Sequence, residues 1–275
     1  MQEIVNFIKK YYKAIIITAL LVIIYFPTLK WMFERWMAVD SYFGHGPLVP
    51  FVSLYLLWQR RKLLKQLQTR PSGLGLVLIA IGLIIHILSA FFRIYFTSGY
   101  SILVVLFGIV LYFFGFALLK AIFFPIFFLI FMIPLPLVAI VNIAFRMKLF
   151  AAYCATFILN KIGIAAVRDG SLIRMRKAIL MVEDPCSGLR SLISLLALGS
   201  LIAYLSKLPS MKKIIVVIAS VPIAILANIA RIVMMCFMSE LYGVQFIEGP
   251  MHTLSGLFVF VVAFIGLAML VKYLE

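Results

Sequence analysis

A cysteine beside a predicted helix start is the side chain in this sequence best suited to covalent chemistry. Cys186 follows Asp184 and Pro185 in the run EDPCSGLRS. Aspartate is favoured as an N-cap and proline at the first helical position, so Cys186 is predicted in the first helical turn. Free N–H groups and the helix dipole favour a nucleophilic thiolate there. Arg190, on the same predicted helical face, could hold that thiolate or a substrate carboxyl group. A packed cysteine and an arginine reaching the lipid headgroups are the alternatives. Ser187 would support the site.

An arginine inside an apolar run is the second candidate. Arg231 lies in IIVVIASVPIAILANIARIVMMCFM, and Asn228 precedes it by three residues on the same predicted helical face. A charge within a membrane span costs about 2.5–3.5 kcal/mol even on the most lenient scale. Such a residue therefore faces a polar cavity or a partner, unless it lies near the helix end and reaches the headgroups.

Histidines supply the third candidate, a group that could exchange protons near neutral pH. His252 begins the last predicted helix in GPMHTLSG, where a structural role is the alternative. His45, in DSYFGHGP, could line the same cleft or stabilise its own loop. His86 lies in the middle of an apolar run, and we interpret it as structural or as a bridge between helices.

These candidates depend on a membrane-embedded scaffold. Of the 275 residues, 65% are hydrophobic and 12% are charged, which excludes a soluble enzyme, a disordered tail and a fibrous protein. The sequence predicts an all-α integral membrane protein, with residues 1–275 forming one membrane-embedded domain. About eight transmembrane helices are expected, near residues 14–32, 43–58, 73–92, 99–119, 121–141, 188–206, 214–238 and 252–271. The fifth carries Pro125, Pro134 and Pro136, so it is expected to be broken or kinked.

The segment between the fifth and sixth spans is expected to carry an insertion. Residues 142–162 are typical of an amphipathic or partly embedded helix. Residues 166–183 contain an Asp-Gly turn between β-favouring runs, which predicts a small hairpin.

Basic residues indicate the orientation. The positive-inside rule favours a cytoplasmic location for both termini and for the loops that carry Lys9, Lys10, Lys13, Arg60, Arg61, Lys62, Lys65, Arg70, Lys120, Lys207, Lys212, Lys213 and Lys272. At 1.5 Å per residue, Cys186, Arg231 and His252 then all lie about 27–31 Å from the inner boundary, at the outer face. A nucleophile, a fixed cation and an imidazole at one level predict a cysteine-based acyl-transfer site.

Other chemistries find little support. The net charge of +16 comes from 25 basic against 9 acidic residues, but no basic soluble stretch is interleaved with aromatic residues, so we expect no nucleic-acid binding. Cys154 and Cys236 lie in apolar stretches, where a cysteine usually packs as a small buried hydrophobic residue. No histidine and carboxylate pair has metal-ligand spacing and no glycine-rich phosphate loop is present, so we expect neither a metal nor a cofactor.

The chain resembles the exosortase/archaeosortase family of membrane-embedded cysteine transpeptidases. The resemblance covers most of the chain and is carried by SYFGHGPLVPFVSLYLLWQRRKLL, FPIFFLIFMIPLP, EDPCSGLRSL, NIARI and the final H-x-x-S-G. It implies that Cys186, Arg231 and His252 correspond to the catalytic residues of the family. The histidine at the third position favours a bacterial exosortase over an archaeosortase.

The resemblance also implies the substrates and the location. Exosortase-like enzymes act on secreted proteins that end in a sorting signal: a short motif such as Pro-Glu-Pro, a transmembrane helix and a basic tail. Cleavage would precede transfer to a surface lipid or polysaccharide acceptor, at the periplasmic face of the bacterial inner membrane. A membrane transporter and a cysteine acyltransferase acting on polysaccharide remain the alternatives.

Overall fold

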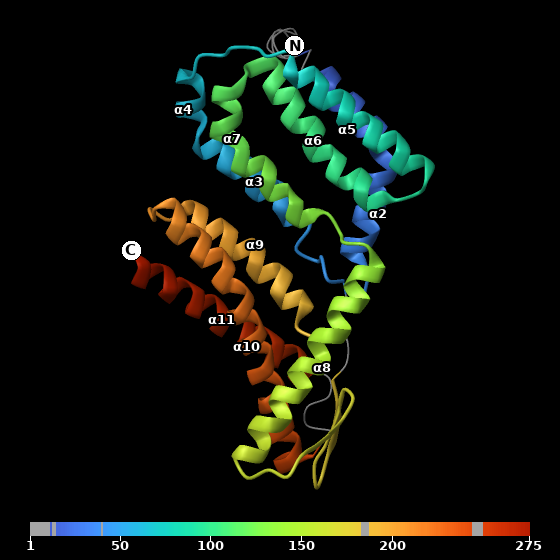
Figure 1. Ribbon diagram of the computed structural model, residues 1–275, viewed down its shortest axis with the longest axis vertical. Coiled ribbons are helices and arrows are strands. Elements are labelled where there is room, and N and C mark those ends of the chain that lie inside the picture. The colour runs from blue at the N-terminus through green and yellow to red at the C-terminus, as the bar shows by residue number, and fades with distance from the viewer. Residues whose placement is uncertain (1–11, 13–14, 40, 183–186, 244–249) are drawn as a thin grey trace, which may run out of the picture. The chain divides into compact units, whose positions relative to one another are not determined.

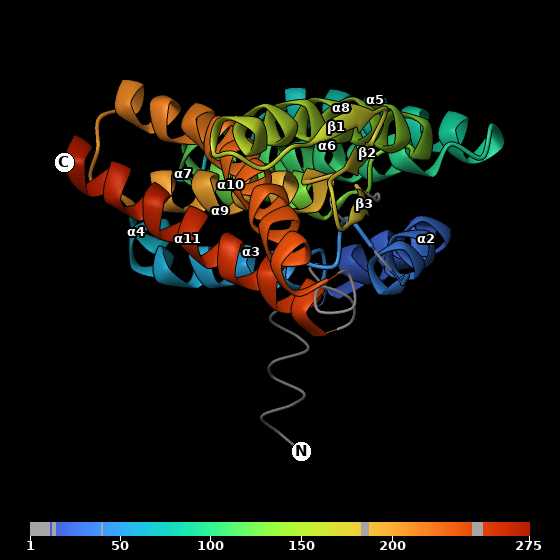
Figure 2. The same ribbon diagram turned by 90° about the horizontal axis from the view of Figure 1, so that it is seen from below.

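The computed structural model describes residues 12, 15–39, 41–182, 187–243 and 250–275, with the backbone alone for residues 250–253. Most of the described chain is helical, and one small sheet is present (Figures 1 and 2). The chain divides into two compact units, Met1–Pro134 and Leu135–Glu275. The predominance of apolar helices confirms the prediction of an all-α membrane protein.

The first unit begins with a bent pair of helices. The helical segment Ile15–Ile24 meets α2 (Phe26–Met37) at an angle of 69°. Pro27, within the first turn of α2, lacks the N–H that a continuous helix needs. The remaining helices are α3 (Leu48–Gln59), α4 (Arg61–Gln66), α5 (Leu74–Phe91), α6 (Tyr95–Phe114), α7 (Phe116–Phe128) and the 3-10 helix η1 (Leu129–Met132).

Hydroxyl groups and one histidine connect three helices of this unit. His86 Nδ1 on α5 lies 2.8 Å from Ser98 Oγ on α6, and the same oxygen lies 2.6 Å from Thr28 Oγ1 on α2. Tyr25, at the bend of the first pair, forms a 2.9 Å hydrogen bond with Ser101. Buried polar groups must find partners in an apolar interior, and these satisfy one another. The interpretation of His86 as a bridge between helices is confirmed.

Helices α5 and α6 pack with their backbones almost in contact. A Cβ atom added at Gly75 would lie 2.3 Å from the backbone nitrogen of Tyr112 and 2.6 Å from the carbonyl oxygen of Gly108. Small residues permit such close approach between membrane helices.

We therefore expect Gly75→Ala to force the two helices apart. The overpacking should cost about 1–3 kcal/mol and lower the melting temperature of the purified protein. Gly73→Ala is the matched control, because a Cβ there meets no atom within 4 Å. Equal melting temperatures for the two variants would contradict this account of the helix pair.

The described part of the second unit contains four helices and the sheet. Its elements are α8 (Leu137–Lys161), β1 (Val167–Asp169), β2 (Leu172–Arg174), β3 (Ile179–Met181), α9 (Leu189–Leu205), α10 (Ser210–Tyr242) and α11 (Pro250–Leu274). The strands are antiparallel in the order β1-β2-β3. The hairpin turn expected from the Asp-Gly signal is present: Asp169 ends β1 and the chain turns at Gly170 and Ser171, with Gly170 at φ +62°. Strand β3 extends the predicted hairpin to three strands.

The sheet packs on α8 and α10 through a shared apolar core. Ile173 and Val182 come from the sheet segment, while Ala152, Ala155, Leu159, Ile229, Ile232, Met235 and Cys236 come from the two helices. The core fixes the sheet against the helix that carries Arg231. Nearer the N-terminal end of α10, Val216 packs with Leu267 of α11 in a separate apolar cluster.

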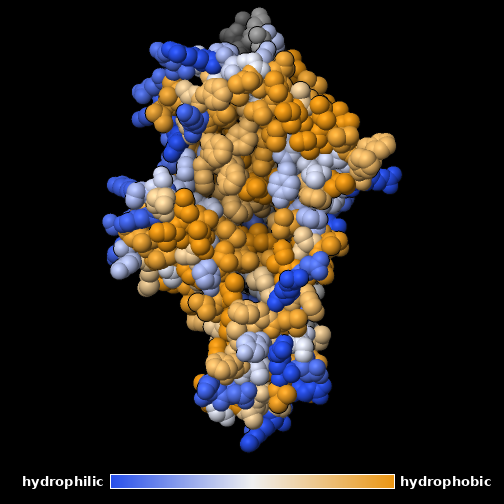
Figure 3. Space-filling model, in the orientation of Figure 1, coloured by the Kyte–Doolittle hydropathy of each residue, from blue (hydrophilic) through white to orange (hydrophobic). Residues whose placement is uncertain are grey.

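Within the described residues, five helices are long and apolar enough to cross a membrane. They are α5, α6, α8, α10 and residues 254–274 of α11, and the bent first pair makes a sixth if it counts as one span. Helices α3 and α9 and the segment Phe116–Met132 are apolar but shorter. On the face that Figure 3 shows, hydrophobic residues cover most of the surface of both units.

The fifth predicted span is broken, as its prolines indicated. Residues 121–141 do not form one helix, because α7 and η1 end at Met132 and α8 begins at Leu137. Pro134 and Pro136 separate them, since proline cannot continue the hydrogen-bonding pattern of a preceding helix. The predicted amphipathic helix 142–162 is instead the larger part of α8, the least apolar of the five long helices. A count of eight spans stays a prediction.

Candidate active site

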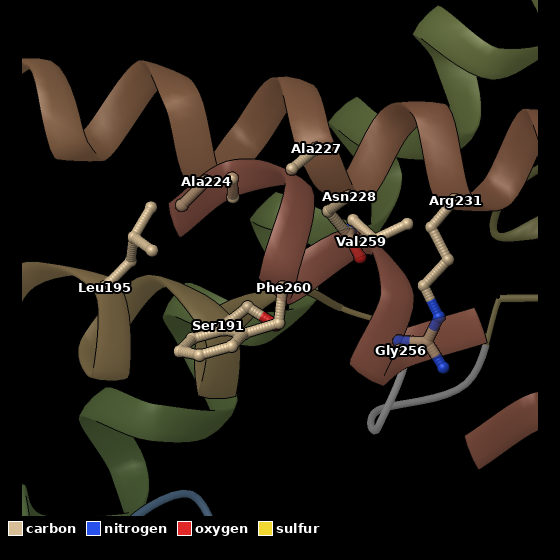
Figure 4. Close-up of a pocket in the computed structure, with 10 residues that line it drawn as sticks. Ser191, Leu195, Ala224, Ala227, Asn228, Arg231, Gly256, Val259 and Phe260 are labelled. Carbon is tan, nitrogen blue, oxygen red and sulfur yellow. The ribbon is translucent and has the colours of Figure 1, made fainter. Parts of the chain in front are cut away.

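The buried guanidinium group of Arg231 is the central feature of the second unit. Arg231 is 7% exposed, and its Nε lies 3.3 Å from Ser255 Oγ on α11. A Cβ added at Gly256 would lie 3.5 Å from Arg231 Cζ, so the α11 backbone passes close beside the guanidinium. Figure 4 shows the Arg231 side chain directed from α10 toward Gly256. Arg231 therefore points into the protein, and the alternative of a side chain reaching the headgroups is excluded.

Asn228 lies one helical turn before Arg231 and contacts the start of α9. It is 4% exposed. A Cβ added at Gly188 would lie 2.7 Å from both Cγ and Nδ2 of Asn228. Gly188 also has φ +81°, in the left-handed region that side-chain-bearing residues rarely adopt. Glycine is thus required here twice, by the backbone conformation and by the close approach of Asn228.

The start of α9 differs from the prediction. The sequence places Asp184 as the N-cap, but the helix begins at Leu189 with Gly188 as its N-cap residue. The left-handed conformation of Gly188 cannot continue a right-handed helix, so the predicted N-cap of α9 at Asp184 is wrong. Cys186 itself lies outside the described residues. Its activation by a helix dipole, and a helical face shared with Arg190, stay predictions.

A small pocket lies among α9, α10 and α11, next to Arg231. Its volume of about 10 Å³ is close to that of one water molecule. Arg231, Asn228 and Ser191 supply its polar groups, and its apolar lining consists of Leu195, Ala224, Ala227, Gly256, Val259, Phe260 and Ala263. Figure 4 shows Ser191 of α9 beside Phe260 of α11. The cation thus lies in a tight, largely apolar enclosure, where its interaction with a negative charge is strong.

A second, larger pocket lies on the other side of Asn228. It has a volume of about 190 Å³. Its lining comes from α8 and α10 and from the segment that precedes α9: Arg146, Met147, Phe150, Ala151, Ser187, Ile225 and Asn228. Asn228 lines both pockets, and the second is mainly apolar, with Arg146 among its lining residues.

The structure locates some of the predicted site residues. Cys186 lies outside the described residues, and for His252 the structure gives the backbone position only, one turn before Ser255 in α11. Ser187 is buried, with its Oγ 3.4 Å from the backbone nitrogen of Leu189. Arg190 is exposed on α9. The roles of these residues remain predictions.

His45 belongs to the first unit, in the turn that precedes α3. Its ring stacks on Phe43, with centroids 6.1 Å apart. The structure therefore gives His45 a local packing contact, and its expected place in the same cleft as Arg231 stays a prediction.

Several residues of the site were not predicted. Ser191, Ser255 and Gly256 surround the guanidinium or line its pocket, and Arg146 and Phe150 line the second pocket. Helical spacing could have indicated three of these residues. Ser255 and Gly256 end the H-x-x-S-G run, about one helical turn after its histidine, and Ser191 lies one turn before Leu195 on α9. Nothing in the sequence pairs α8 with Asn228, because that contact depends on tertiary packing.

This arrangement can stabilise negative charge. The guanidinium offers several N–H donors in a plane, and its burial reduces screening by water. A developing oxyanion, a thiolate or a carboxylate would each be stabilised there. Among the described residues, no group of three histidine, cysteine or acidic side chains could hold a metal ion.

Gly188→Ala should test the contact between α9 and Asn228. The substitution adds left-handed strain of about 1–2 kcal/mol and an overlap with Asn228 that should cost about 1–3 kcal/mol more. Gly163→Ala is the matched control, since Gly163 has φ +89° but no atom within 4 Å of an added Cβ. We expect a clearly lower melting temperature for Gly188→Ala than for Gly163→Ala. The same loss in both variants would show that backbone strain alone matters.

One protein family matches this chain. The sequence model of that family, described as transmembrane exosortase (Exosortase_EpsH), matches residues 36–269. No curated protein and no solved structure matches the chain. The family match includes the sequence around Cys186 and all of the described residues that surround Arg231.

Proposed function

Because the chain belongs to the transmembrane exosortase family, we propose that it is a membrane-embedded cysteine transpeptidase. Its substrates would be secreted proteins that end in a sorting signal, which consists of a Pro-Glu-Pro-like motif, a transmembrane helix and a basic tail. Its products would be proteins joined to a surface lipid or polysaccharide. The observation that carries the proposal is the buried guanidinium of Arg231, held between α10 and α11 beside the start of α9.

In the first half-reaction, the thiolate of Cys186 attacks the carbonyl carbon of the peptide bond beside the motif. A carbon–sulfur bond forms, and the carbonyl oxygen becomes an oxyanion that Arg231 stabilises. The carbon–nitrogen bond then breaks. The departing amine takes a proton from His252, and the thioester remains on Cys186.

In the second half-reaction, a nucleophilic group of the acceptor attacks the thioester. His252 takes the proton that this group loses, and Cys186 leaves as the thiolate. Water in place of the acceptor would give hydrolysis. The proposal places Asn228 and Ser187 as supporting groups, since Asn228 contacts Gly188 and Ser187 adjoins Cys186 in the chain.

The proposed topology has eight spans and both termini in the cytoplasm of a bacterial cell, with the site at the outer face of the inner membrane. Eight spans result if α8 does not cross and the shorter helices do. Helix α3, at 12 residues, is about 18 Å long, so it would need flanking residues or local thinning of the bilayer. The basic residues of the predicted cytoplasmic loops support this orientation.

A co-expression assay tests the proposed activity. A secreted reporter with the motif, helix and basic tail would be produced together with the enzyme and followed by gel mobility. The expected result is a shortened reporter, whose new C-terminus is defined by mass spectrometry and carries the acceptor. A reporter with a scrambled motif but the same helix and tail is the matched control. If no tail of this kind is processed, the transporter interpretation takes precedence.

A further inference from the structure

Within the described residues, the small sheet of the second unit has one edge that is open and uncharged. Strand β3, Ile179–Met181, lies at the end of the order β1-β2-β3 (Figure 2). No strand within the described part of the chain pairs with its outer side. An apolar edge without charge or proline is a template for another strand, and proteins normally protect such edges.

The backbone of β3 presents two residues to that outer side. Met175 N bonds to Ala178 O at 2.8 Å, and Val182 N bonds to Ser171 O at 3.0 Å. Hydrogen-bonded pairs alternate in an antiparallel ladder, so Ile179 and Met181 direct their N–H and C=O groups away from β2. These are the groups that an added strand would bind.

The side chains of the same two residues form an apolar surface beside the edge. Ile179 is 55% exposed and Met181 is 56% exposed, whereas Leu180 between them points into the core. A strand added at this edge would thus find both backbone partners and apolar side-chain contacts.

The opposite edge of the sheet is protected. Arg168 of β1 places its guanidinium 5.8 Å from the ring centroid of Tyr153, and Asp169 forms an ion pair with Arg174 at 3.5 Å. Charged side chains discourage pairing at a sheet edge. The two edges therefore differ in a way that favours β3 as the binding side.

The position of β3 connects it to the candidate active site. Cys186 follows Met181 by five residues, a reach of at most about 17 Å. The sheet is fixed to α10, since Ile173 and Val182 share a core with Ile229 and Ile232, and Lys177 N donates to Glu240 Oε2 at 3.0 Å. Helix α10 also carries Arg231, so the edge and the cation belong to one packed assembly.

We propose that the outer edge of β3 binds the substrate as an added β-strand, pairing with an extended peptide segment within about five residues of the bond that Cys186 attacks. This inference rests on the proposed transpeptidase function and adds the surface that recognises the peptide. Backbone pairing supplies affinity for any extended segment, while Ile179 and Met181 favour apolar side chains at alternate positions.

Photo-crosslinking tests where the peptide binds. A benzophenone side chain is introduced at Ile179 or, as a control on the protected edge, at Val167, which is 69% exposed. Both proteins carry Cys186→Ala, and the sorting-signal reporter is co-expressed. We expect crosslinks to the reporter segment next to the motif from position 179 and few from position 167. Equal crosslinking at both positions, crosslinks to a second copy of the enzyme, or crosslinks to lipid alone would overturn the proposal.

A backbone variant tests the pairing itself. Ile179→Pro removes an N–H that points away from β2 together with the isoleucine side chain, and proline is tolerated at such edges. We expect the half-saturating reporter concentration to rise about three- to tenfold with little change in maximal rate. Ile179→Thr, which keeps the N–H, and Arg168→Pro, on the protected edge, are the controls.

The two tests separate the proposals. If the wild type processes the reporter and Ile179→Pro has wild-type kinetics, the edge proposal fails and the transpeptidase proposal stands. If the wild type processes no reporter, the transpeptidase proposal fails, while the crosslinks still report whether β3 binds the peptide.

Discussion

Cys186→Ala is expected to abolish processing of the sorting-signal reporter while the protein reaches the membrane in normal amounts. The reaction proposed here requires a carbon–sulfur bond to this residue, and alanine offers no nucleophile. Removing the nucleophile of an enzyme that forms a covalent intermediate commonly costs several orders of magnitude in rate. We expect a fall of at least about a thousandfold, measured as the fraction of reporter shortened over time.

The other two cysteines provide matched controls. Cys154 is half-buried on α8, and Cys236 is fully buried in the core shared by α10 and the sheet. Cys154→Ala and Cys236→Ala should process the reporter at nearly the wild-type rate, with a modest loss of stability for Cys236→Ala because a small cavity forms. If Cys186→Ala still shortens the reporter, Cys186 is not the nucleophile, and the interpretation of the chain as a transporter takes precedence.

Trapping adds a readout that does not depend on turnover. In the wild type, the acyl part of the reporter should be found attached to Cys186 by mass spectrometry, and hydroxylamine should release it as expected for a thioester. An alkylating agent added first should prevent the attachment. Attachment at Cys154 instead would assign the nucleophile to α8.

Arg231→Lys is expected to lower the processing rate about a hundred- to a thousandfold, the usual loss when one donor to an oxyanion is removed. Lysine keeps the positive charge but lacks the planar fork of N–H groups. The geometry makes this difference important, since Arg231 Nε already lies 3.3 Å from Ser255 Oγ and the guanidinium passes close to Gly256. A lysine ammonium cannot bond to Ser255 and direct further donors into the site in the same fixed plane.

Arg93→Lys is the matched control for this variant. Arg93 is exposed between α5 and α6 of the first unit, so the same substitution there should leave the rate within about twofold of wild type. Purified Arg231→Lys should be compared with wild type by thermal melting, because removal of a buried guanidinium can also affect folding. A folded Arg231→Lys protein with normal activity would show that only the charge matters, and a large loss in Arg93→Lys would show that the loss is not specific to the candidate site.

The contact between Gly188 and Asn228 explains how the two halves of the candidate site are held together. Gly188 is two residues from Cys186, and Asn228 is one turn from Arg231. Their close approach therefore couples the chain near the proposed nucleophile to the helix that carries Arg231. An error of about 1 Å in such positioning can cost a hundredfold in rate.

The sequence by itself determined the membrane character, the helical class and most helix positions, because apolar runs of sufficient length have few alternatives to spanning helices. It also predicted the hairpin turn that follows Asp169. It indicated Arg231 and Asn228, because a charged side chain inside an apolar run is costly and normally faces a polar cavity or a partner. These features depend on residues that are close together in the sequence, so the sequence was sufficient to predict them.

Only the tertiary structure decided where α9 begins, which direction Arg231 faces and what lies on either side of Asn228. Asp184 and Pro185 are good helix-start residues, yet the left-handed Gly188 and its packing on Asn228 move the start to Leu189. Pairing between α8, the sheet and α10 brings together residues far apart in the chain. Such contacts depend on packing across the whole unit, so they cannot be predicted from the hydrophobic periodicity of one segment.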